Sequence, residues 1–341
     1  MKKHRITIKD IAEKLNISPS TVSRALKDHP DINPNTKKAV KELAEKYNYI
    51  PNKIALGLLQ NQSNTIGVII PEIIHHFFST VISGIENAAY EQGYNVMICQ
   101  SMESYEKEVK NVQTLLSNHI DGLLISISKE TEKFDHLKNF KEIGLPIVFF
   151  DRIAEDIESD KVIVDDYGGA YQATEHLISI GCKKIAHFYG PLNLLIGINR
   201  YNGYVQALKD NNYPIKEEYM LFCDSYEEAK KQTKKLLENS EPPDAIFAVN
   251  DLTAVGAMQV VMDAGYKVPE DIAIVGFTNS FISPLTSPSL STIDQNGYTM
   301  GKEAANILFQ RIKESQEDKS KPITKLLDSD LIIRESSQRK K

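Results

Sequence analysis

One stretch decides how the N-terminal part of this chain folds: Ile17-Ser18-Pro19-Ser20-Thr21-Val22-Ser23-Arg24-Ala25-Leu26. Ser18 suits a helix N-cap, because its hydroxyl can accept a hydrogen bond from an otherwise unpaired amide of the first turn. Pro19 suits the first helical position, where a missing N–H costs nothing. Val22, Ala25 and Leu26 then share one face of the helix. The stretch therefore predicts a short helix whose remaining surface carries small polar and cationic side chains: Ser20, Thr21, Ser23 and Arg24.

Further helices are predicted on both sides of this stretch. Before it, apolar residues recur at helical spacing: Ile8, Ile11, Ala12 and Leu15. After it, Asn33 can cap a third helix that has Pro34 at its first position. The apolar stripe of that helix is Val40, Leu43, Ala44 and Tyr47. Two short helices joined by a tight turn and braced by a third form a helix-turn-helix unit, which typically binds DNA. Small three-helix units also serve as dimerisation or scaffold modules.

The charge distribution favours the DNA-binding interpretation. Residues 1–62 contain twelve Lys or Arg and six Asp or Glu, which gives this segment a net charge of +6. The whole chain has a net charge of −6, so the remainder carries −12. A cationic head on an acidic body is the pattern expected when the head binds the phosphate backbone of DNA.

An ordered set of motifs resembles the lactose-repressor (LacI/GalR) family of bacterial transcriptional regulators. The matching residues are Thr7-Ile8-Lys9-Asp10-Ile11-Ala12, Ser18 through Leu26, and Asn48-Tyr49-Ile50-Pro51-Asn52 followed by Ala55 and Leu58. The resemblance continues to about residue 335 and covers nearly the whole chain. It implies a dimeric regulator that acts as a repressor, binds a pseudo-palindromic operator in double-stranded DNA and is controlled by a small-molecule effector.

The resemblance also implies roles for residues of the head. Pro19, Ser20 and Arg24 would face base edges, while Thr21 and Ser23 would hold the phosphate backbone. An Arg is well suited to read guanine, although Arg24 could instead contact a phosphate. The full set expected to contact DNA is Thr7, Ser18, Pro19, Ser20, Thr21, Ser23, Arg24, Asn52, Ala55 and Leu58.

Residues 52–59 resemble the hinge helix of the family, which folds only when two copies meet on DNA. Leu58 matches the leucine that wedges into the minor groove and kinks the duplex. The alternative is an ordinary linker in which Leu58 packs on the body. Gly57 departs from a good helix sequence and costs about 1 kcal/mol relative to alanine. This departure predicts a hinge whose folding depends strongly on DNA.

Length and composition indicate a soluble protein of several domains. The chain has 341 residues, of which 41% are apolar and 25% are charged. The three scattered cysteines, Cys99, Cys182 and Cys223, suggest neither a disulfide framework nor a zinc site. The basic N-terminus is not followed by the apolar segment of a signal peptide, and no apolar run is long enough to span a membrane. We therefore expect a cytoplasmic protein with no membrane partner.

Beyond residue 64, strand-like and helix-like segments alternate, which predicts parallel sheets with helical crossovers. The predicted strands are Ile66–Ile70, Asn95–Cys99, Gly122–Ile127, Pro146–Phe150, Val162–Val164, Lys184–Tyr189, Met220–Cys223, Ala245–Val249 and Ile272–Phe277. The predicted helices are Thr80–Gln92, Glu106–Asn118, Gly169–Ile180, Asn202–Asn211, Glu227–Glu238 and Leu252–Ala264. Nine strands are too many for one typical sheet, so we expect two lobes.

The expected fold is multidomain, with an all-α helix-turn-helix head and an α/β body like the periplasmic binding proteins, made of two doubly wound parallel-sheet lobes. The resemblance places Ser291–Gln295 and Tyr298–Lys313 in the first lobe and Leu326–Ile333 in the second. The expected domains are the head, 1–51; the hinge and linker, 52–63; the N-terminal lobe, 64–163 plus 292–322; and the C-terminal lobe, 164–291 plus 323–341.

Ligands of open α/β sheets bind at the carboxyl ends of strands. At or near these ends lie the residues that the resemblance implies for effector binding: Phe77, Phe78, Asp151, Arg200, Asn250, Phe277, Thr278 and Gln295. Phe77 and Phe78 could instead be lobe core, Arg200 a surface ion pair, and Asp151 a lobe-crossing hydrogen bond. Thr278 stands where many family members have Asp. The effector of a known family member therefore cannot be assigned directly to this chain. A sugar or sugar derivative is expected by analogy alone.

No motif predicts catalysis, a metal or a cofactor. His75 and His76 lack a third ligand at useful spacing. Asp165 and Asp166 are more typical of helix capping than of an acid–base pair. No leucine heptad follows the body, so a dimer rather than a tetramer is expected. Two other function classes stay open: a ligand receptor without a DNA role, against which the basic head argues, and an enzyme that uses the cleft.

Overall fold

The computed structural model describes residues 6–49, 62–314 and 320–339. The chain forms two compact units, Met1–Ser63 and Asn64–Lys341. The expected hinge residues Asn52, Ala55 and Leu58 lie outside the described residues.

The head consists of three helices, as the sequence predicts. They are α1 (Ile8–Leu15), α2 (Pro19–Leu26) and α3 (Pro34–Lys46). Their facing apolar side chains form one small core, in which the fully buried positions are Ile11, Ala12, Val22, Ala25, Val40 and Ala44. Tyr47 differs from expectation, because 41% of its surface is exposed. The Lys14 ammonium lies 5.2 Å from the centre of its ring, while Tyr49 packs against the core instead.

Each helix of the head begins at a side-chain cap. The Thr7 hydroxyl accepts from the Asp10 amide, and the Asp10 carboxylate accepts from the Thr7 amide, forming a reciprocal capping box. Ser18 accepts from the Thr21 amide at 3.1 Å, and Asn33 accepts from the Asn35 amide at 2.8 Å. The turn between α1 and α2 is made by Asn16 in the left-handed conformation, with φ 52°. These caps fix where the recognition stretch begins.

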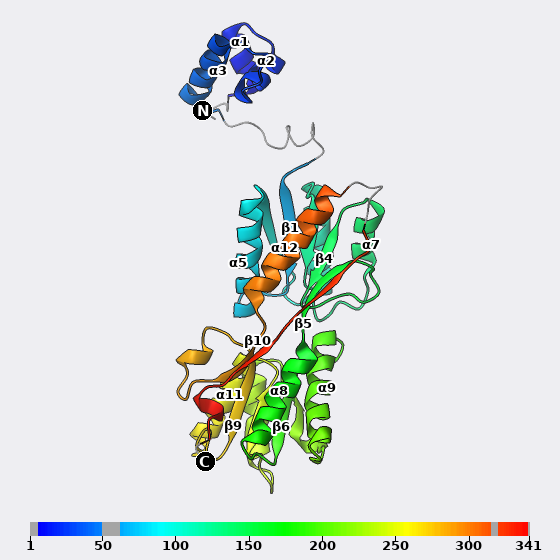
Figure 1. Ribbon diagram of the computed structural model, residues 1–341, viewed down its shortest axis with the longest axis vertical. Coiled ribbons are helices and arrows are strands. Elements are labelled where there is room, and N and C mark those ends of the chain that lie inside the picture. Colours follow the sequence, from blue (N-terminus) through cyan, green and yellow to red (C-terminus); the bar gives the residue numbers. More distant parts are fainter. Residues whose placement is uncertain (1–5, 50–61, 315–319, 340–341) are drawn as a thin grey trace. The chain divides into compact units, whose positions relative to one another are not determined.

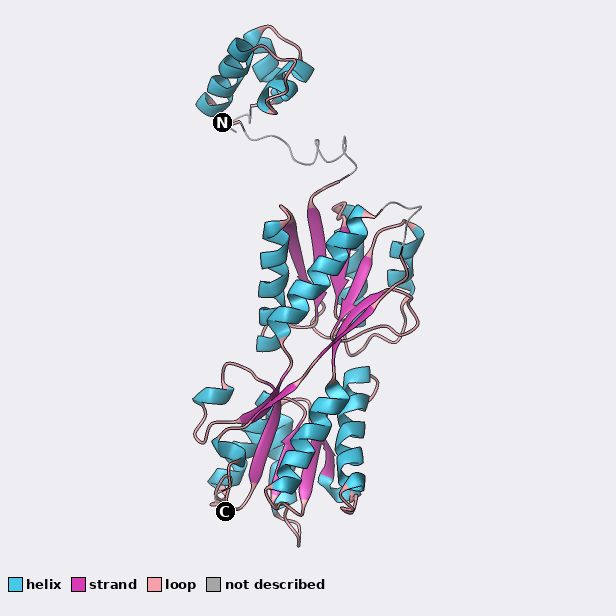
Figure 2. Ribbon diagram, in the orientation of Figure 1, coloured by secondary structure: helices cyan, strands magenta, loops and turns pink. Residues whose placement is uncertain are grey.

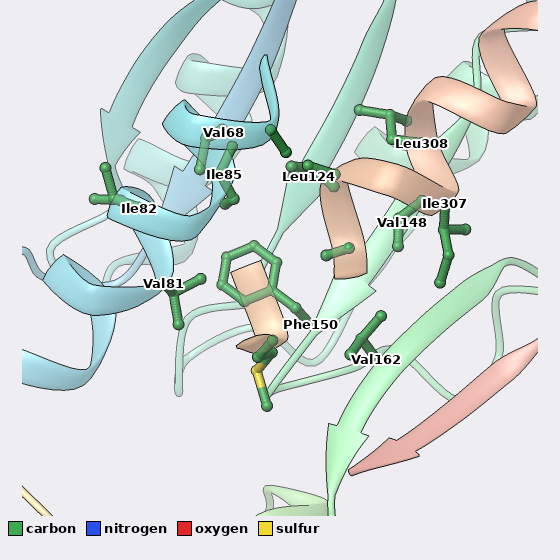
Figure 3. Close-up of a cluster of buried hydrophobic side chains, with 14 of the residues drawn as sticks. Val68, Val81, Ile82, Ile85, Leu124, Val148, Phe150, Val162, Ile307 and Leu308 are labelled. Atoms are coloured by element: carbon green, nitrogen blue, oxygen red, sulfur yellow. The ribbon is translucent and has the colours of Figure 1, made fainter. Parts of the chain in front are cut away.

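The first lobe of the body is built on a parallel sheet with the strand order β11-β5-β4-β3-β1-β2. Its strands are β1 (Thr65–Ile70), β2 (Asn95–Gln100), β3 (Gly122–Ile125), β4 (Ile147–Phe150), β5 (Asp160–Val164) and β11 (Thr324–Leu327). One face is covered by α5 (His76–Glu91) and α12 (Gly297–Lys313), which lie side by side (Figure 1). Phe150, Val148 and Leu308 belong to the core between that face and its helices (Figure 3). The other face is covered by α6 (Tyr105–Ser117) and α7 (Asp135–Glu142).

The second lobe repeats this plan with the strand order β12-β10-β9-β8-β6-β7. Its strands are β6 (Ile185–Tyr189), β7 (Met220–Phe222), β8 (Ala245–Ala248), β9 (Ala273–Thr278), β10 (Ser291–Asp294) and β12 (Asp330–Ile332). Helices cover both faces of each sheet (Figure 2). In this lobe, α8 (Asp166–Ser179) and α9 (Leu195–Asp210) cover one face, and α10 (Tyr226–Leu237) and α11 (Asp251–Asp263) cover the other. Short 3-10 turns lie at Glu217–Tyr219, Ser283–Leu285 and Glu335–Ser337.

The chain crosses between the lobes three times, but two crossings differ from expectation. The prediction that 291–295 returns to the first lobe is wrong for the strand, because β10 pairs in parallel with β9 of the second sheet. The return occurs after Asp294 and delivers α12. The prediction that Leu326–Ile333 belongs to the second lobe is also wrong in part, because β11 pairs with β5 of the first sheet. Only β12 lies in the second sheet, and it runs antiparallel to β10.

Two helices begin earlier than predicted, and this moves expected site residues. Helix α5 begins at His76 rather than Thr80, so Phe77 and Phe78 lie in its first turn and not in a loop. Helix α9 begins at Leu195 rather than Asn202, so Arg200 lies inside a helix. Helix α7 was not predicted, since half of its residues are charged and its buried apolar residues are few.

A glycine governs how closely α12 approaches α5. A Cβ added at Gly301 would lie 2.0 Å from the backbone oxygen of Val81, which is a clash that no side-chain movement relieves. In an exposed helix, Gly→Ala stabilises by about 1 kcal/mol. Here we expect Gly301→Ala to destabilise the body by about 1–3 kcal/mol through overpacking. Urea unfolding should give this sign, with the exposed Ser83→Ala as control on α5. A stabilised Gly301→Ala variant would contradict the close approach.

Candidate functional site

The recognition stretch presents its polar side chains at the surface of the head. Ser18, Pro19, Ser20 and Arg24 are exposed, while Thr21 and Ser23 are half-buried beside the core. The Ser18 hydroxyl lies 2.7 Å from that of Ser20 and 2.8 Å from that of Thr21. Within residues 6–49, the Arg24 guanidinium has no ion-pair partner. Its charge is therefore available to an external partner.

The body contains a cavity of about 480 Å³ at the carboxyl ends of the strands, which is within the range of roughly 300–1,000 Å³ typical of small-molecule sites. Both lobes contribute to its walls. Of the eight residues expected to bind an effector, the structure places seven in the cavity lining: Phe77, Phe78, Asp151, Arg200, Asn250, Thr278 and Gln295. Phe277 does not line the cavity and is fully buried behind it.

Phe77 and Phe78 belong both to the core of the first lobe and to the cavity wall. Each is almost fully buried, and their rings meet edge to face with centroids 5.2 Å apart. The two interpretations that the sequence left open are therefore compatible, because packing holds the rings whose edges border the cavity.

Arg200 is held in one orientation by three contacts. Its Nε and Nη2 atoms each lie 2.7 Å from Oδ1 of Asp166, and Nη1 donates to the Val249 carbonyl at 2.7 Å. Its guanidinium carbon lies 3.8 Å from the centroid of the Phe277 ring. The alternative of a surface ion pair is wrong, because Arg200 is only 4% exposed. Phe277 thus acts as the platform under Arg200.

Asp151 directly follows β4 and has the left-handed backbone conformation, with φ 59°. Its carboxylate accepts from the Ser126 hydroxyl at 3.5 Å and lies 3.9 Å from Nε of Arg152. Both neighbours belong to its own lobe, and among the described residues no hydrogen bond of this carboxylate crosses between lobes. Burial raises the pKa of Asp151 to about 6, although the charges of Arg152 and Arg200 oppose the shift. This carboxyl group can therefore either accept or donate a hydrogen bond near neutral pH.

Three further polar residues complete the expected set: Asn250 and Thr278 of the second lobe, and Gln295 in the crossing after β10. The Asn250 side-chain oxygen caps α11 by accepting from the Thr253 amide at 2.9 Å. Thr278 donates from its hydroxyl to Oε1 of Gln295 at 3.0 Å. Because the oxygens of Asn250 and Gln295 are used in this way, their NH₂ groups remain as the donors that a ligand could use.

A network of paired charges, which was not predicted from the sequence, surrounds the cavity. Glu103 forms a two-pronged ion pair with Nη1 of Arg152, at 2.8 and 2.9 Å. Lys129 reaches across the lobes, with its ammonium 3.1 Å from Asp224 and its carbonyl accepting from Asn193 at 2.6 Å. No local pattern could reveal pairs so distant in sequence.

Asp251 also lines the cavity, although it was not among the residues expected to bind an effector. Its buried carboxylate accepts from the Ser280 amide at 2.6 Å and from the Ser283 hydroxyl at 2.7 Å. It also accepts from the Thr292 hydroxyl at 2.5 Å. Asp251 therefore ties the loop that closes one side of the cavity to β10 and α11. An acidic residue at the start of an otherwise apolar helix was the available sequence indication.

The histidines near the cavity have other partners. His75 lies 3.1 Å from Glu72, and the His76 ring meets the Phe281 ring edge on with centroids 5.2 Å apart. Across the described residues, no three His, Cys, Asp or Glu side chains are grouped to hold a metal ion. In the same part of the chain, every helix is too short or too polar to cross a membrane.

Known families match most of the first unit and nearly all of the second. Residues 7–52 match the bacterial regulatory proteins of the lacI family, and residues 63–333 match the periplasmic binding proteins and sugar-binding domain of the LacI family. The chain belongs to the LacI family of bacterial regulatory proteins. This LacI-family protein is thus a transcriptional regulator with a helix-turn-helix head and a separate ligand-binding body.

Individual relatives agree with this assignment. The HTH-type transcriptional repressor PurR of Actinobacillus pleuropneumoniae serotype 3 (strain JL03) is 32% identical over 331 residues, which cover 97% of this chain and 98% of that protein. The lac repressor dimer bound to operator and the anti-inducer ONPF is 26% identical, covers 98% of this chain and 100% of its own, and has a TM-score of 0.87. The regulator CelR in its complex with cellobiose is 27% identical, covers 97% and 100%, and has a TM-score of 0.73.

Replacing Asp151 should change how stability depends on pH. Because burial raises the pKa of Asp151 to about 6, the folded protein holds this proton more tightly than the unfolded chain, where an Asp titrates near 4. The stability that protonation confers is present below about pH 4 and is lost as pH rises through about 6. This contribution to the free energy of unfolding is at most about 3 kcal/mol. Asn has no charge and tolerates the same backbone conformation. Asp151→Asn should therefore be more stable than wild type at pH 7.5.

The measurement is urea unfolding of both proteins at pH 4 and at pH 7.5. Subtracting the two free energies of unfolding at each pH removes the contribution of the other titrating groups. The advantage of Asp151→Asn should shrink toward zero at pH 4. An advantage that does not depend on pH would show that burial does not shift the pKa of this carboxyl group.

Proposed function

We propose that this LacI-family protein is a dimeric repressor whose affinity for a pseudo-palindromic operator is controlled by a small molecule in the cavity of the body. The observation that carries the proposal is the exposed polar face of α2, on which Arg24 has no partner within residues 6–49. Each head would read one half-site in the major groove, and the dimer would read two.

We assign base contacts to Pro19, Ser20 and Arg24, and backbone contacts to Thr21, Ser23, Ser18 and Thr7. Ser18 and Thr7 also cap helices, so their exposed hydroxyls would approach the phosphates from helix N-termini. Asn52, Ala55 and Leu58 complete the set through the hinge, as the resemblance implies.

We assign effector binding to the seven cavity-lining residues, with Phe277 as the support of Arg200. A sugar or sugar derivative is the proposed class, supported by the cellobiose in the CelR complex. The ligand would favour one arrangement of the lobes and thereby change operator affinity, which is a coupling free energy between two sites. The cavity is proposed to bind without catalysis, and the protein to act in the bacterial cytoplasm, where chromosomal DNA is found.

The test is selection of genomic DNA fragments by the purified full-length protein at fixed salt. We expect a common site made of two inverted half-sites. The correct small molecule should then change operator binding by the wild-type protein. It should have no effect on operator binding by Arg200→Met, which keeps the head intact. Recovery of fragments with no common dyad would refute the proposed operator, and a ligand response of wild-type size in Arg200→Met would refute the proposed effector site.

A further inference from the structure

The cavity has several cationic side chains, but each of them is already neutralised by a carboxylate. Arg200 is paired with Asp166 at 2.7 Å, and Arg152 is paired with Glu103 at 2.8 Å. The third cation, Lys129, lies 3.1 Å from Asp224. Arg200 and Arg152 are mostly shielded from solvent, so their pairs are only weakly screened.

The carboxylates of the cavity outnumber its cations. Three cations, Lys129, Arg152 and Arg200, belong to the lining, as do five carboxylates, Glu72, Glu103, Asp151, Asp224 and Asp251. Asp166 adds a further negative charge behind Arg200. The electrostatic environment is therefore unfavourable for an anion.

An anionic ligand would have to break one of these ion pairs. Taking Arg152 or Arg200 would leave Glu103 or Asp166, both largely shielded from solvent, without its cationic partner, which is costly. Phosphate-binding sites instead present cations or amides that are free to receive the charge. The lining of this cavity holds no such free cation among the described residues.

The uncommitted groups suit an uncharged ligand. Asn250 and Gln295 retain their NH₂ groups as donors, and Asp151 can accept from a hydroxyl. Phe77 and Phe78 border the cavity, and Phe281, at its mouth, is 64% exposed. Such rings pack against the C–H faces of an uncharged ring compound, while the polar groups fix its hydroxyls.

We propose that the effector is an uncharged polyhydroxyl compound, and that the paired charges of Glu103–Arg152, Asp166–Arg200 and Asp224–Lys129 exclude the phosphate esters and acids of the same compounds. This inference rests on the proposed function, because it concerns the ligand of the same cavity. It assigns Glu103 and Asp224 a role in specificity: they keep Arg152 and Lys129 from receiving an anion.

A fluorescent reporter can test the charge argument before the effector is known. The chain contains no Trp, so Phe281→Trp places the only tryptophan at the cavity mouth. In this background, the double variant Glu103→Gln/Asp224→Asn removes the two carboxylates but keeps oxygen acceptors, including one for the Lys129 amide that Glu103 now holds at 2.8 Å. The probe is inorganic phosphate at constant ionic strength, with chloride as control.

We expect phosphate to cause no saturable change in tryptophan fluorescence in the single Phe281→Trp protein. In the triple variant we expect a saturable change, because Arg152 and Lys129 become available there. A saturable response in the protein that keeps Glu103 and Asp224 would overturn the proposal. So would a triple variant that stays silent. Since phosphate itself is the probe, this experiment tests whether the paired charges exclude an anion even if no tested sugar binds.

The second arm compares matched pairs such as glucose and glucose 6-phosphate, ribose and ribose 5-phosphate, and trehalose and trehalose 6-phosphate. Wherever the neutral member binds, its phosphate ester should bind roughly ten- to hundredfold more weakly. A phosphate ester that binds as well or better would overturn the inference. The proposed function would survive that result if the ester also changed operator binding, whereas failure to select a palindromic operator would remove the proposed function whatever the cavity prefers.

Discussion

Arg24→Ala should lose most of the sequence-specific affinity for the operator while the head stays folded. A bidentate Arg–guanine contact is worth about 1–3 kcal/mol of discrimination. A dimer loses two of them, so we expect a loss of roughly 2–6 kcal/mol, or about 30- to 20,000-fold. Arg24 is exposed and lies outside the apolar core of the head, so its removal does not disturb the packing of α1 to α3.

The measurement is binding of the selected operator and of a scrambled duplex at the same salt concentration. Lys27→Ala is the matched control, because it removes one exposed positive charge directly after the same helix. It should weaken both duplexes by similar factors, as expected for a phosphate contact. If Arg24→Ala also weakens both duplexes equally, Arg24 contacts the backbone and does not read a base.

The head could be predicted from its sequence because its information is local. Ser18 and Pro19 define the start of α2, and Asn33 and Pro34 define the start of α3. Each cap acts within three residues along the chain, so neither needs knowledge of the tertiary structure. Tyr47 was misplaced because it lies at the end of α3, where apolar periodicity cannot distinguish a core position from one covered by lysine side chains.

The crossings of the body could not be predicted in the same way. Strands β10, β11 and β12 have only three or four residues each. The sheet to which such a strand belongs is decided by its hydrogen-bonding neighbour and not by its own pattern. Ser291, for example, pairs with Val275, and a loop with a 3-10 turn separates the two residues along the chain.

The candidate site was predicted in part, for a similar reason. The rule that ligands lie at the carboxyl ends of strands, together with the resemblance, selected seven residues that now line one cavity. It could not reveal which of their charges are already paired. Lys129 and Asp224 are 95 positions apart, and Asp166 and Arg200 are 34 apart. Those pairings, which determine the chemistry of the cavity, exist only in the folded protein.

Asp251→Ala should cause a large loss of stability in the body. Its carboxylate accepts hydrogen bonds from Ser280, Ser283 and Thr292, and all four residues are buried. Each buried donor left without a partner costs about 1–3 kcal/mol, and we expect a total of roughly 3–5 kcal/mol after relaxation. Asp263→Ala, at the exposed end of the same helix, is the control and should change stability by no more than about 0.5 kcal/mol.

Urea unfolding of the full chain measures both effects. A loss below about 1 kcal/mol for Asp251→Ala would mean that these donors form hydrogen bonds with water instead.

A double-mutant cycle makes the test specific. A Cβ added at Gly276 would lie 2.3 Å from Oδ1 of Asp251, so Gly276→Ala must displace this carboxylate. The substitution should be costly in wild type and much less costly once Asp251 is already Ala, since both changes remove the same contacts. Additive losses would show that Gly276 is required by some other neighbour, such as Ala254, and not by the carboxylate that organises this wall of the cavity.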